Sequence, residues 1–176
     1  MVLLKFQKGY EITKLERKNS FAFTTNFLVE YRIFIFPCKE VIPDFIFAEY
    51  TWYIEFLPLP NTIPLIKGNK ESRAYKRDEK VMPTIMNFMI DILQTKTNII
   101  GIEFSTDRGL AQAREKYFSD LFEKYNETYK PLHKMDFQIE EQKKGSIIFR
   151  TDHPDFAKIC TITDKEIIKN IKDKKI

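Results

Sequence analysis

The spacing of apolar residues makes the N-terminal third of the chain rich in predicted strands. Apolar and polar positions alternate from Phe21 to Phe36, with the turn residue Asn26 between two runs, and this predicts a β-hairpin. A second alternating run predicts a long strand from Phe45 to Leu57. Two further short strands are expected within Leu4 to Thr13. The N-terminal third should therefore form a mainly antiparallel sheet.

Helical spacing begins after a proline-rich break. Three prolines end the sheet, because proline lacks the N–H donor of a central ladder, and a polar connection is expected at 58–80. Val81 to Leu93 is apolar on nearly all sides and predicts a buried helix, which is followed by a short strand from Ile99 to Phe104. Residues 110–129 repeat apolar side chains every three or four positions and predict a surface helix with one apolar face.

The last third predicts a second hairpin and a terminal helix. Phe137–Gln142 and Ser146–Thr151 pair across a short turn, and Thr163 with Glu166 has the spacing of a capping box. The predicted order is ββ(ββ)-α-β-α-β-β-α, an α+β (mixed α/β) fold with helices packed on a mostly antiparallel sheet. The core is expected to include Phe34, Phe47, Ile85, Phe88, Ile92, Ile100, Ile102, Tyr117, Leu121 and Ile148.

Length and composition fit one folded domain. The chain has 176 residues, which matches the usual size of a single domain, so we expect one domain over 1–176. Hydrophobic residues at 43% and aromatic residues at 14% supply enough apolar surface for a core. Two cysteines far apart in the sequence match neither a disulfide framework nor a zinc site. With neither a signal peptide nor a membrane span in the pattern, we expect a soluble, cytoplasmic protein that does not bind membranes.

The formal charge of +4 is concentrated in two stretches. Lys67 to Lys80 and Lys165 to Lys175 each carry a net charge of +3, and the rest of the chain is slightly acidic. Lysine, isoleucine and phenylalanine have codons rich in A and T, so the gene of an AT-rich bacterium would also explain this basicity. Nucleic-acid binding is therefore an alternative that we do not favour.

The turn Ser105-Thr106-Asp107-Arg108-Gly109 is the best candidate for a ligand site. It joins a buried strand to a helix, where free helix amides and the helix dipole favour an anion. Ser105, Thr106, Asp107 and Arg108 are therefore the candidate ligand-binding residues, for a phosphate or carboxylate. The alternative is that Thr106 or Asp107 only caps the helix.

Other catalytic chemistries have little support. His133 and His153 are the two histidines, and neither has an acidic or cysteine partner at metal-ligand spacing, so we expect no metal site. The stretch Asp152 to Asp155 is explained by helix capping without catalysis. Serine-hydrolase elbows, phosphate-binding loops and dinucleotide fingerprints are absent from the sequence, which has five glycines.

Three segments share features with known proteins: Tyr75 to Leu93, Ile99 to Tyr125, and Ser146 to Ile159, which includes the run Ile-Ile-Phe-Arg-Thr-Asp-His-Pro. Together they resemble an uncharacterised bacterial domain-of-unknown-function family. The likeness covers roughly two thirds of the chain and implies no established activity.

The predicted element order also resembles the Gcn5-related acetyltransferase fold. Ala113, Tyr117 and Phe122 stand where that superfamily has an Ala-x-x-x-Tyr-x-x-x-Gly-Phe stretch, so the resemblance gives Tyr117 the role of protonating the departing thiolate of coenzyme A. The glycine of that stretch is Leu121 here. Gly68 is the single glycine where the superfamily has its pyrophosphate-binding loop.

These departures decide which function we favour. We expect a non-catalytic intracellular binding or interaction protein on an acetyltransferase-like scaffold, with a protein partner and no cofactor. An acyl-CoA-dependent acyltransferase, or another small-molecule enzyme with Tyr117 as its catalytic residue, is the first alternative. Weak nucleic-acid binding is the second.

Overall fold

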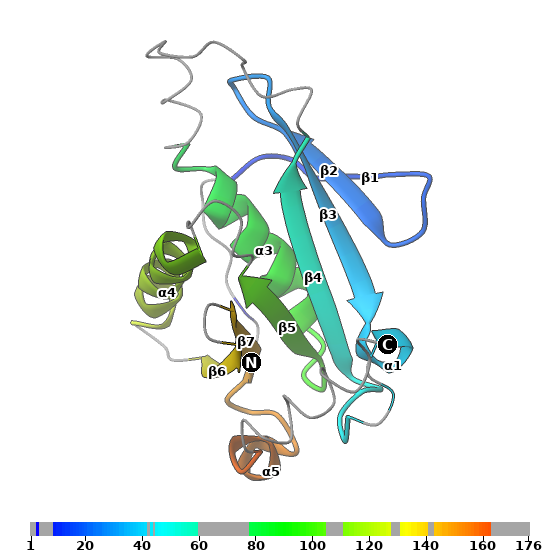
Figure 1. The fold of residues 1–176 in the computed structure, drawn as a ribbon, viewed down its shortest axis with the longest axis vertical. Coiled ribbons are helices and arrows are strands. Elements are labelled where there is room, and N and C mark those ends of the chain that lie inside the picture. Colours follow the sequence, from blue (N-terminus) through cyan, green and yellow to red (C-terminus); the bar gives the residue numbers. More distant parts are fainter. Residues whose placement is uncertain are drawn as a thin grey trace. The chain divides into compact units, whose positions relative to one another are not determined.

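The computed structural model describes residues 3, 9–41, 43, 45–59, 78–104, 111–127, 131–140 and 143–162. Their helices and strands follow one another as shown in Figure 1: β1 (Thr13–Lys14), β2 (Ser20–Thr24), β3 (Glu30–Pro37), α1 (Cys38–Val41), β4 (Thr51–Pro58), α3 (Val81–Leu93), β5 (Ile99–Phe104), α4 (Ala111–Asn126), β6 (Leu132–Glu140), β7 (Lys143–Arg150) and α5 (Phe156–Cys160).

The seven described strands are hydrogen-bonded in the order β1-β2-β3-β4-β5-β7-β6. β4 runs parallel to β5, whereas the pairs β1 with β2, β2 with β3, β5 with β7, and β6 with β7 are antiparallel. The fold is therefore α+β, with helices packed on a mostly antiparallel sheet, as the sequence predicted.

Contacts divide the chain into two compact units. Unit 1 comprises Met1–Leu3, Phe36–Ile54 and Asp91–Ile176, and unit 2 comprises Leu4–Ile35 and Glu55–Ile90. The predicted single domain over 1–176 stays a prediction. Residues 60–77, most of the predicted connection at 58–80, lie outside the described part of the chain.

Unit 2 is built on the predicted N-terminal hairpin. β2 and β3 pair from Ser20 with Phe34 to Thr24 with Glu30, which confirms the hairpin between Phe21 and Phe36. The rings of Phe23 and Tyr31 stack across the two strands with their centroids 5.1 Å apart. The α3 part of this unit is buried on several sides, at Val81, Met82, Thr84, Ile85, Met86, Phe88, Met89 and Ile90, as its sequence predicted.

Unit 1 is organised around β5. Ile99, Ile100 and Ile102 are all buried, because β5 lies between β4 and β7 and successive residues point to opposite faces of the sheet. One face carries an apolar cluster made of Cys38, Phe45, Phe47, Ala48, Ile99, Phe137, Ile147, Phe149 and Ile159. The other face is covered by α4, which contacts β5 and buries Phe118 and Phe122.

The structure corrects the predicted strand from Phe45 to Leu57. β4 begins at Thr51, and residues 45–50 form turns in which Ala48 N donates to Phe45 O and Tyr50 N to Phe47 O. Phe45 and Phe47 are nevertheless buried, so their alternation reflects packing of a turn and not of a strand. The C-terminal hairpin is also longer than predicted, with strands at 132–140 and 143–150.

The predicted core is confirmed at Phe47, Ile85, Phe88, Ile100, Ile102 and Ile148, and wrong at Tyr117. Tyr117 is 46% exposed, whereas its neighbour Phe118 is 1% exposed. One residue turns a helix by about 100°, so a small error in the orientation of the apolar face exchanges the two positions. Phe34, Ile92 and Leu121 are half-buried. The predicted helix after Thr163 lies outside the described residues.

Two glycines in the strands of unit 1 lie under aromatic rings. A Cβ on Gly101 would lie 2.8 Å from Cε1 of Tyr53, its register partner on β4. A Cβ on Gly145 would lie 2.5 Å from Cζ of Phe137, its partner on β6, and 3.0 Å from the backbone oxygen of Ile102. Each ring thus occupies the space that a side chain would take, which compensates for a glycine within a strand.

Replacing Gly145 by Ala should destabilise the protein by about 2 kcal/mol, because Phe137 and a backbone oxygen crowd the new methyl group. Gly9→Ala is the matched control, since its nearest neighbour would be Asn87 Nδ2 at 3.3 Å. Urea unfolding measures both free energies. Equal losses for the two variants would contradict the crowding at Gly145.

Candidate functional site

The turn predicted to bind a ligand lies outside the described residues. β5 ends at Phe104 and α4 begins at Ala111, so a strand and a helix flank the segment as predicted. The site formed by Ser105, Thr106, Asp107 and Arg108 stays a prediction. Tyr117, the other candidate, lies on α4 with an exposed ring.

The polar stretch that follows β7 is described in full and surrounds a buried arginine. Arg150 is 2% exposed, and its guanidinium forms a two-pronged contact with Asp152, from Nε to Oδ1 at 2.7 Å and from Nη2 to Oδ2 at 2.8 Å. These hydrogen bonds hold the pKa of the Asp152 carboxyl below its usual range and raise the pKa of Arg150.

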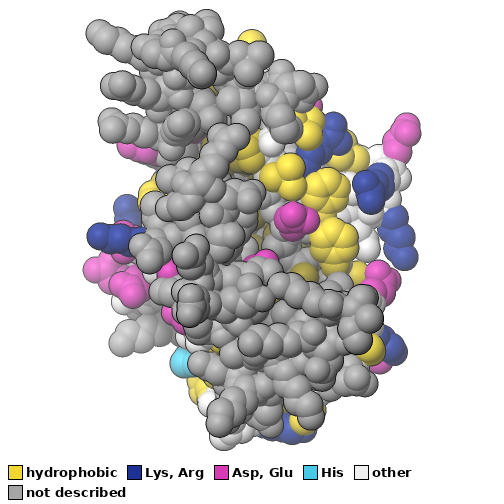
Figure 2. Space-filling view, in the orientation of Figure 1, with side chains coloured by type: hydrophobic (Ala, Val, Ile, Leu, Met, Phe, Trp, Pro, Cys, Tyr) yellow, Lys and Arg dark blue, Asp and Glu magenta, His cyan; other side chains and the backbone are white. Residues whose placement is uncertain are grey.

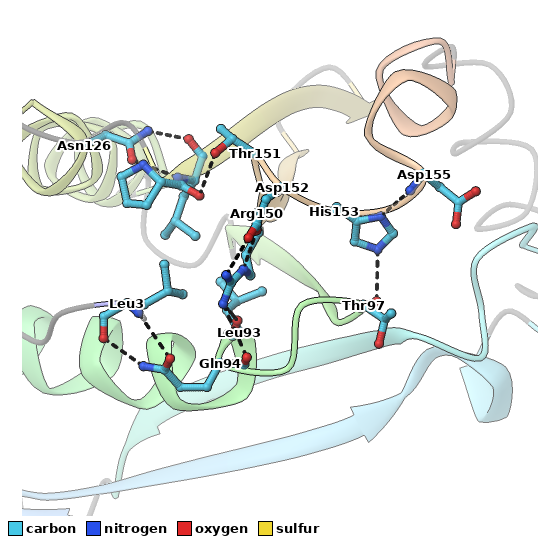
Figure 3. Close-up of polar contacts among 12 residues, drawn as sticks. Leu3, Leu93, Gln94, Thr97, Asn126, Arg150, Thr151, Asp152, His153 and Asp155 are labelled. Carbon is cyan, nitrogen blue, oxygen red and sulfur yellow. Dashed lines mark hydrogen bonds and ion pairs between the residues drawn. The ribbon is translucent and has the colours of Figure 1, made fainter. Parts of the chain in front are cut away.

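Arg150 also caps the end of α3 within unit 1. Its Nη1 donates to the backbone oxygens of Leu93 and Gln94, at 3.3 Å each (Figure 3). The last carbonyls of a helix lack partners within the helix and carry partial negative charge, so a cation stabilises them. The last turn of α3 contains no basic residue, and the cation comes from β7 instead.

His153 is held by two hydrogen bonds beside this arginine. The ring is 4% exposed; its Nε2 lies 3.0 Å from the backbone oxygen of Thr97, and its Nδ1 accepts from the N–H of Asp155 at 3.0 Å (Figure 3). Both bonds together require a neutral ring with the proton on Nε2. Asp152 pairs with Arg150, and Asp155 is the α5 N-cap residue without a side-chain cap bond. These partners explain the stretch without catalysis, although Asp152 and Asp155 do not cap as the sequence suggested.

Two side-chain amides in unit 1 each bind both the backbone N–H and the backbone carbonyl oxygen of one other residue. Gln94 donates from Nε2 to Leu3 O at 2.8 Å and accepts from Leu3 N at 3.2 Å. Asn126 accepts from Leu132 N at 3.0 Å and donates to Leu132 O (Figure 3). Each amide makes the pair of hydrogen bonds that a neighbouring strand would make. The outward-facing N–H and carbonyl oxygen of Leu132, at the start of the edge strand β6, therefore both have partners.

A polar cluster between α4 and the sheet was not predicted from the sequence. Lys134 Nζ lies 2.7 Å from both carboxylate oxygens of Asp136 and 3.1 Å from Ser119 Oγ, and Ser146 donates to Asp136. The cluster therefore ties α4 to β6. In the sequence, Lys134 and Asp136 stand two positions apart, which places them on the same face of a strand. In the structure, that face of β6 packs under α4.

A cleft of about 360 Å³ lies at the end of α4 and the start of β6. It is lined by Phe122, Glu123, Asn126, Glu127, Leu132, His133 and Thr151. The centroid of the His133 ring lies 5.3 Å from the centroids of Phe149 and Phe156, tilted to the first ring and roughly perpendicular to the second. Among the described residues, no group of three histidine, cysteine or acidic side chains could hold a metal ion.

Exposed apolar side chains stand at turns of both units. In unit 2, Phe27 is 40% and Leu28 78% exposed at the β2–β3 turn; in unit 1, Ile46 is 63% and Tyr50 47% exposed before β4. Figure 2 shows further hydrophobic side chains gathered over β3 and β4.

Replacing Arg150 by Ala should lower the free energy of unfolding by about 3 kcal/mol, because it leaves helix carbonyls and a carboxylate without their partner. The control is Lys39→Ala, which removes an ion pair to Glu49 whose side chains are both 62% exposed and should cost under about 1 kcal/mol. Urea unfolding compares the two. A similar loss in both variants would show that Arg150 does not hold the helix end.

The pair Arg150–Asp152 should make stability depend on pH. Folding lowers the pKa of Asp152, so its contribution is complete above the unfolded pKa of about 3.9 and is lost as the pH falls through the lower folded value. Urea unfolding of wild type and Asp152→Asn between about pH 6 and pH 3 should give a gap that narrows below about pH 4. A gap that stays constant over this range would contradict the assignment.

No family model matches the chain, and no curated protein matches it. None of the described helices is long and apolar enough to cross a membrane.

Proposed function

We propose that the chain is a non-catalytic, cytoplasmic binding protein on an acetyltransferase-like scaffold, and that it binds a protein partner. The observation that carries this proposal is the exposure of large apolar side chains at turns, above all Leu28 and Ile46. Turns usually carry polar residues or glycine, and grouped exposed apolar residues mark interaction sites. Two such turns, one in each unit, support binding over a purely structural role.

The element order supports the scaffold. Antiparallel strands are followed by α3, β5, α4 and the β6–β7 hairpin, which is the order that the acetyltransferase resemblance implies. Phe122, which matches the superfamily's phenylalanine, is buried. Leu121 replaces the superfamily's glycine and is half-buried.

An acyl-CoA-dependent acyltransferase is the second candidate, and one observation favours it. The exposed position of Tyr117 on α4 leaves its ring accessible to a ligand. The departures in the sequence favour a lost acyl-CoA site, because a lone Gly68 offers few closely approaching amides for a pyrophosphate. Weak nucleic-acid binding stays a third alternative, since most of Lys67–Lys80 and all of Lys165–Lys175 lie outside the described residues.

Calorimetry with acetyl-CoA tests the choice between binding protein and enzyme. Wild type should give no saturable heat at concentrations where a micromolar site would fill, because the sequence has one glycine, Gly68, where the superfamily has its pyrophosphate-binding loop. Tyr117→Phe and Tyr50→Phe form a matched pair, because both tyrosines are exposed to a similar degree. Micromolar binding that Tyr117→Phe weakens and Tyr50→Phe leaves unchanged would decide for the enzyme.

A further inference from the structure

We propose that β6 is the surface through which two copies of this chain associate, with their β6 strands pairing antiparallel about Met135. β6 is the last strand in the order of the sheet, so one of its sides has no neighbouring strand among the described residues. This surface belongs to unit 1. It is separate from the turns that carry the proposed function, so the inference goes beyond that function.

The backbone of β6 shows which residues present hydrogen-bonding groups to the open side. Pro131 O accepts from Thr151 N at 3.0 Å, which continues the β6–β7 ladder, so the odd-numbered residues bond to β7. The even-numbered residues from Leu132 to Asp136 turn their N–H and C=O groups outward, because successive residues of an antiparallel strand point these groups to opposite sides. The bonds between the Asn126 amide and Leu132 agree with this direction.

The open stretch of β6 is short and has defined ends. The Asn126 amide already satisfies Leu132, and the register of β6 against β7 shifts after Gln138. Between these points the outward groups belong to Lys134 and Asp136. Two N–H and two C=O groups thus lack a hydrogen-bond partner in the described part of the chain. A second strand would supply partners for all four groups, which favours a strand as the occupant.

The side chains of this stretch are complementary to themselves. When Met135 lies opposite Met135 of the second copy, Lys134 lies opposite Asp136 of that copy, and the reverse pair forms at the other end. Both charged side chains lie on the face of β6 under α4, where Lys134 contacts Ser119. The Asp136 side chain is 53% exposed, which leaves it room for a second cation. Opposite charges directly across two strands stabilise their pairing.

The neighbouring registers are disfavoured by the same residues. A shift of two positions in one direction places Lys134 opposite Lys134 of the second copy, and in the other direction Asp136 opposite Asp136, and like charges directly opposite destabilise a strand pair. A shift of one position sets the outward groups against residues whose backbone already bonds to β7. Charge and backbone therefore select one register, and its two-fold symmetry closes the assembly at a dimer.

Lys134 does not protect this edge against pairing. A charged side chain on an edge strand commonly prevents association, because pairing would bury it without a partner. The Lys134 side chain is 10% exposed and lies 2.7 Å from both carboxylate oxygens of Asp136. Its charge is thus compensated within its own strand, so pairing would bury no isolated charge.

The opposite face of β6 also favours a second copy over a strand of another protein. Phe137 belongs to the apolar cluster of unit 1, and Met135 packs against that cluster. In the proposed register the two Met135 side chains would meet, and His133 would lie opposite Phe137 of the second copy. The apolar layer would therefore continue from one copy to the other. A foreign strand would have to reproduce both this layer and the reversed order of charges.

Sedimentation equilibrium of the full chain, from about 1 to about 500 µM, tests the pairing. Wild type should form dimers. Lys134→Asp and Asp136→Lys each place like charges opposite one another, so each variant alone should dimerise at least about tenfold more weakly. An equimolar mixture of the two should restore the dimer, because each strand then faces opposite charges. Lys39→Asp is the control, since it changes an exposed charge of unit 1 outside β6 and should leave dimerisation unchanged.

Disulfide cross-linking is a second test that does not depend on the charge variants. Met135→Cys should form an intermolecular disulfide on oxidation, because the two cysteines would face each other at the two-fold axis. Cys160→Ser removes the exposed native cysteine, and Cys38 is buried. His133→Cys is the matched control, because position 133 lies on the same face but would face position 137. Non-reducing electrophoresis compares the yields of disulfide dimer.

Several results would overturn the inference. A wild type that stays monomeric throughout would exclude the dimer, and a dimer that neither charge variant weakens would place the interface elsewhere. Folded variants that stay monomeric when mixed would contradict the register, as would equal disulfide yields at positions 135 and 133. Where circular dichroism shows a charge variant to be unfolded, the cysteine comparison decides. All of these results leave the proposed function standing, because the exposed turns are not part of β6.

Discussion

The buried guanidinium of Arg150 is the contact on which the structure of unit 1 depends. An arginine that is 2% exposed needs partners for its donors, and it finds them in Asp152 and in the last carbonyls of α3. His153 and Gln94 add bonds to Thr97 and Leu3, so the end of α3 becomes a junction between Leu3, β7 and the segment before α5. The last turn of α3 has no cation of its own, so Arg150 on β7, a strand distant in the sequence, binds its final carbonyls.

The central strand of unit 1 follows from a second constraint, which is close packing on both of its faces. β5 is lined by isoleucines and carries Gly101 where the ring of Tyr53 lies over the backbone. The same arrangement recurs between Phe137 and Gly145 at the next pair of strands. Large aromatic residues and scarce glycines are therefore matched across strands, which fixes the register of the sheet.

These contacts bear on function because they show which polar side chains are engaged in holding the fold together and which side chains face solvent. Lys134 and Asp136 are bound to each other between α4 and the sheet, and His153 is held by backbone groups. Among the described residues, large apolar side chains face solvent at the β2–β3 turn, above all Leu28, and at Ile46 before β4. The proposed binding function rests on these exposed apolar side chains.

The sequence by itself determined the elements whose apolar spacing is strong and local: α3, β5 and the N-terminal hairpin, with α3 and β5 at the predicted bounds. Tertiary structure decided what depends on partners far apart in the chain. The alternating apolar pattern at Phe45 and Phe47 is produced by a packed turn as readily as by a strand. Helical spacing likewise could not tell whether Tyr117 or Phe118 faces the sheet. No local pattern in the sequence marks Arg150 as buried, because Leu93 and Gln94, whose carbonyls it binds, are more than fifty positions away. Local periodicity reports a residue's own element, whereas the burial of a charge such as Arg150 is set by what folding brings beside it.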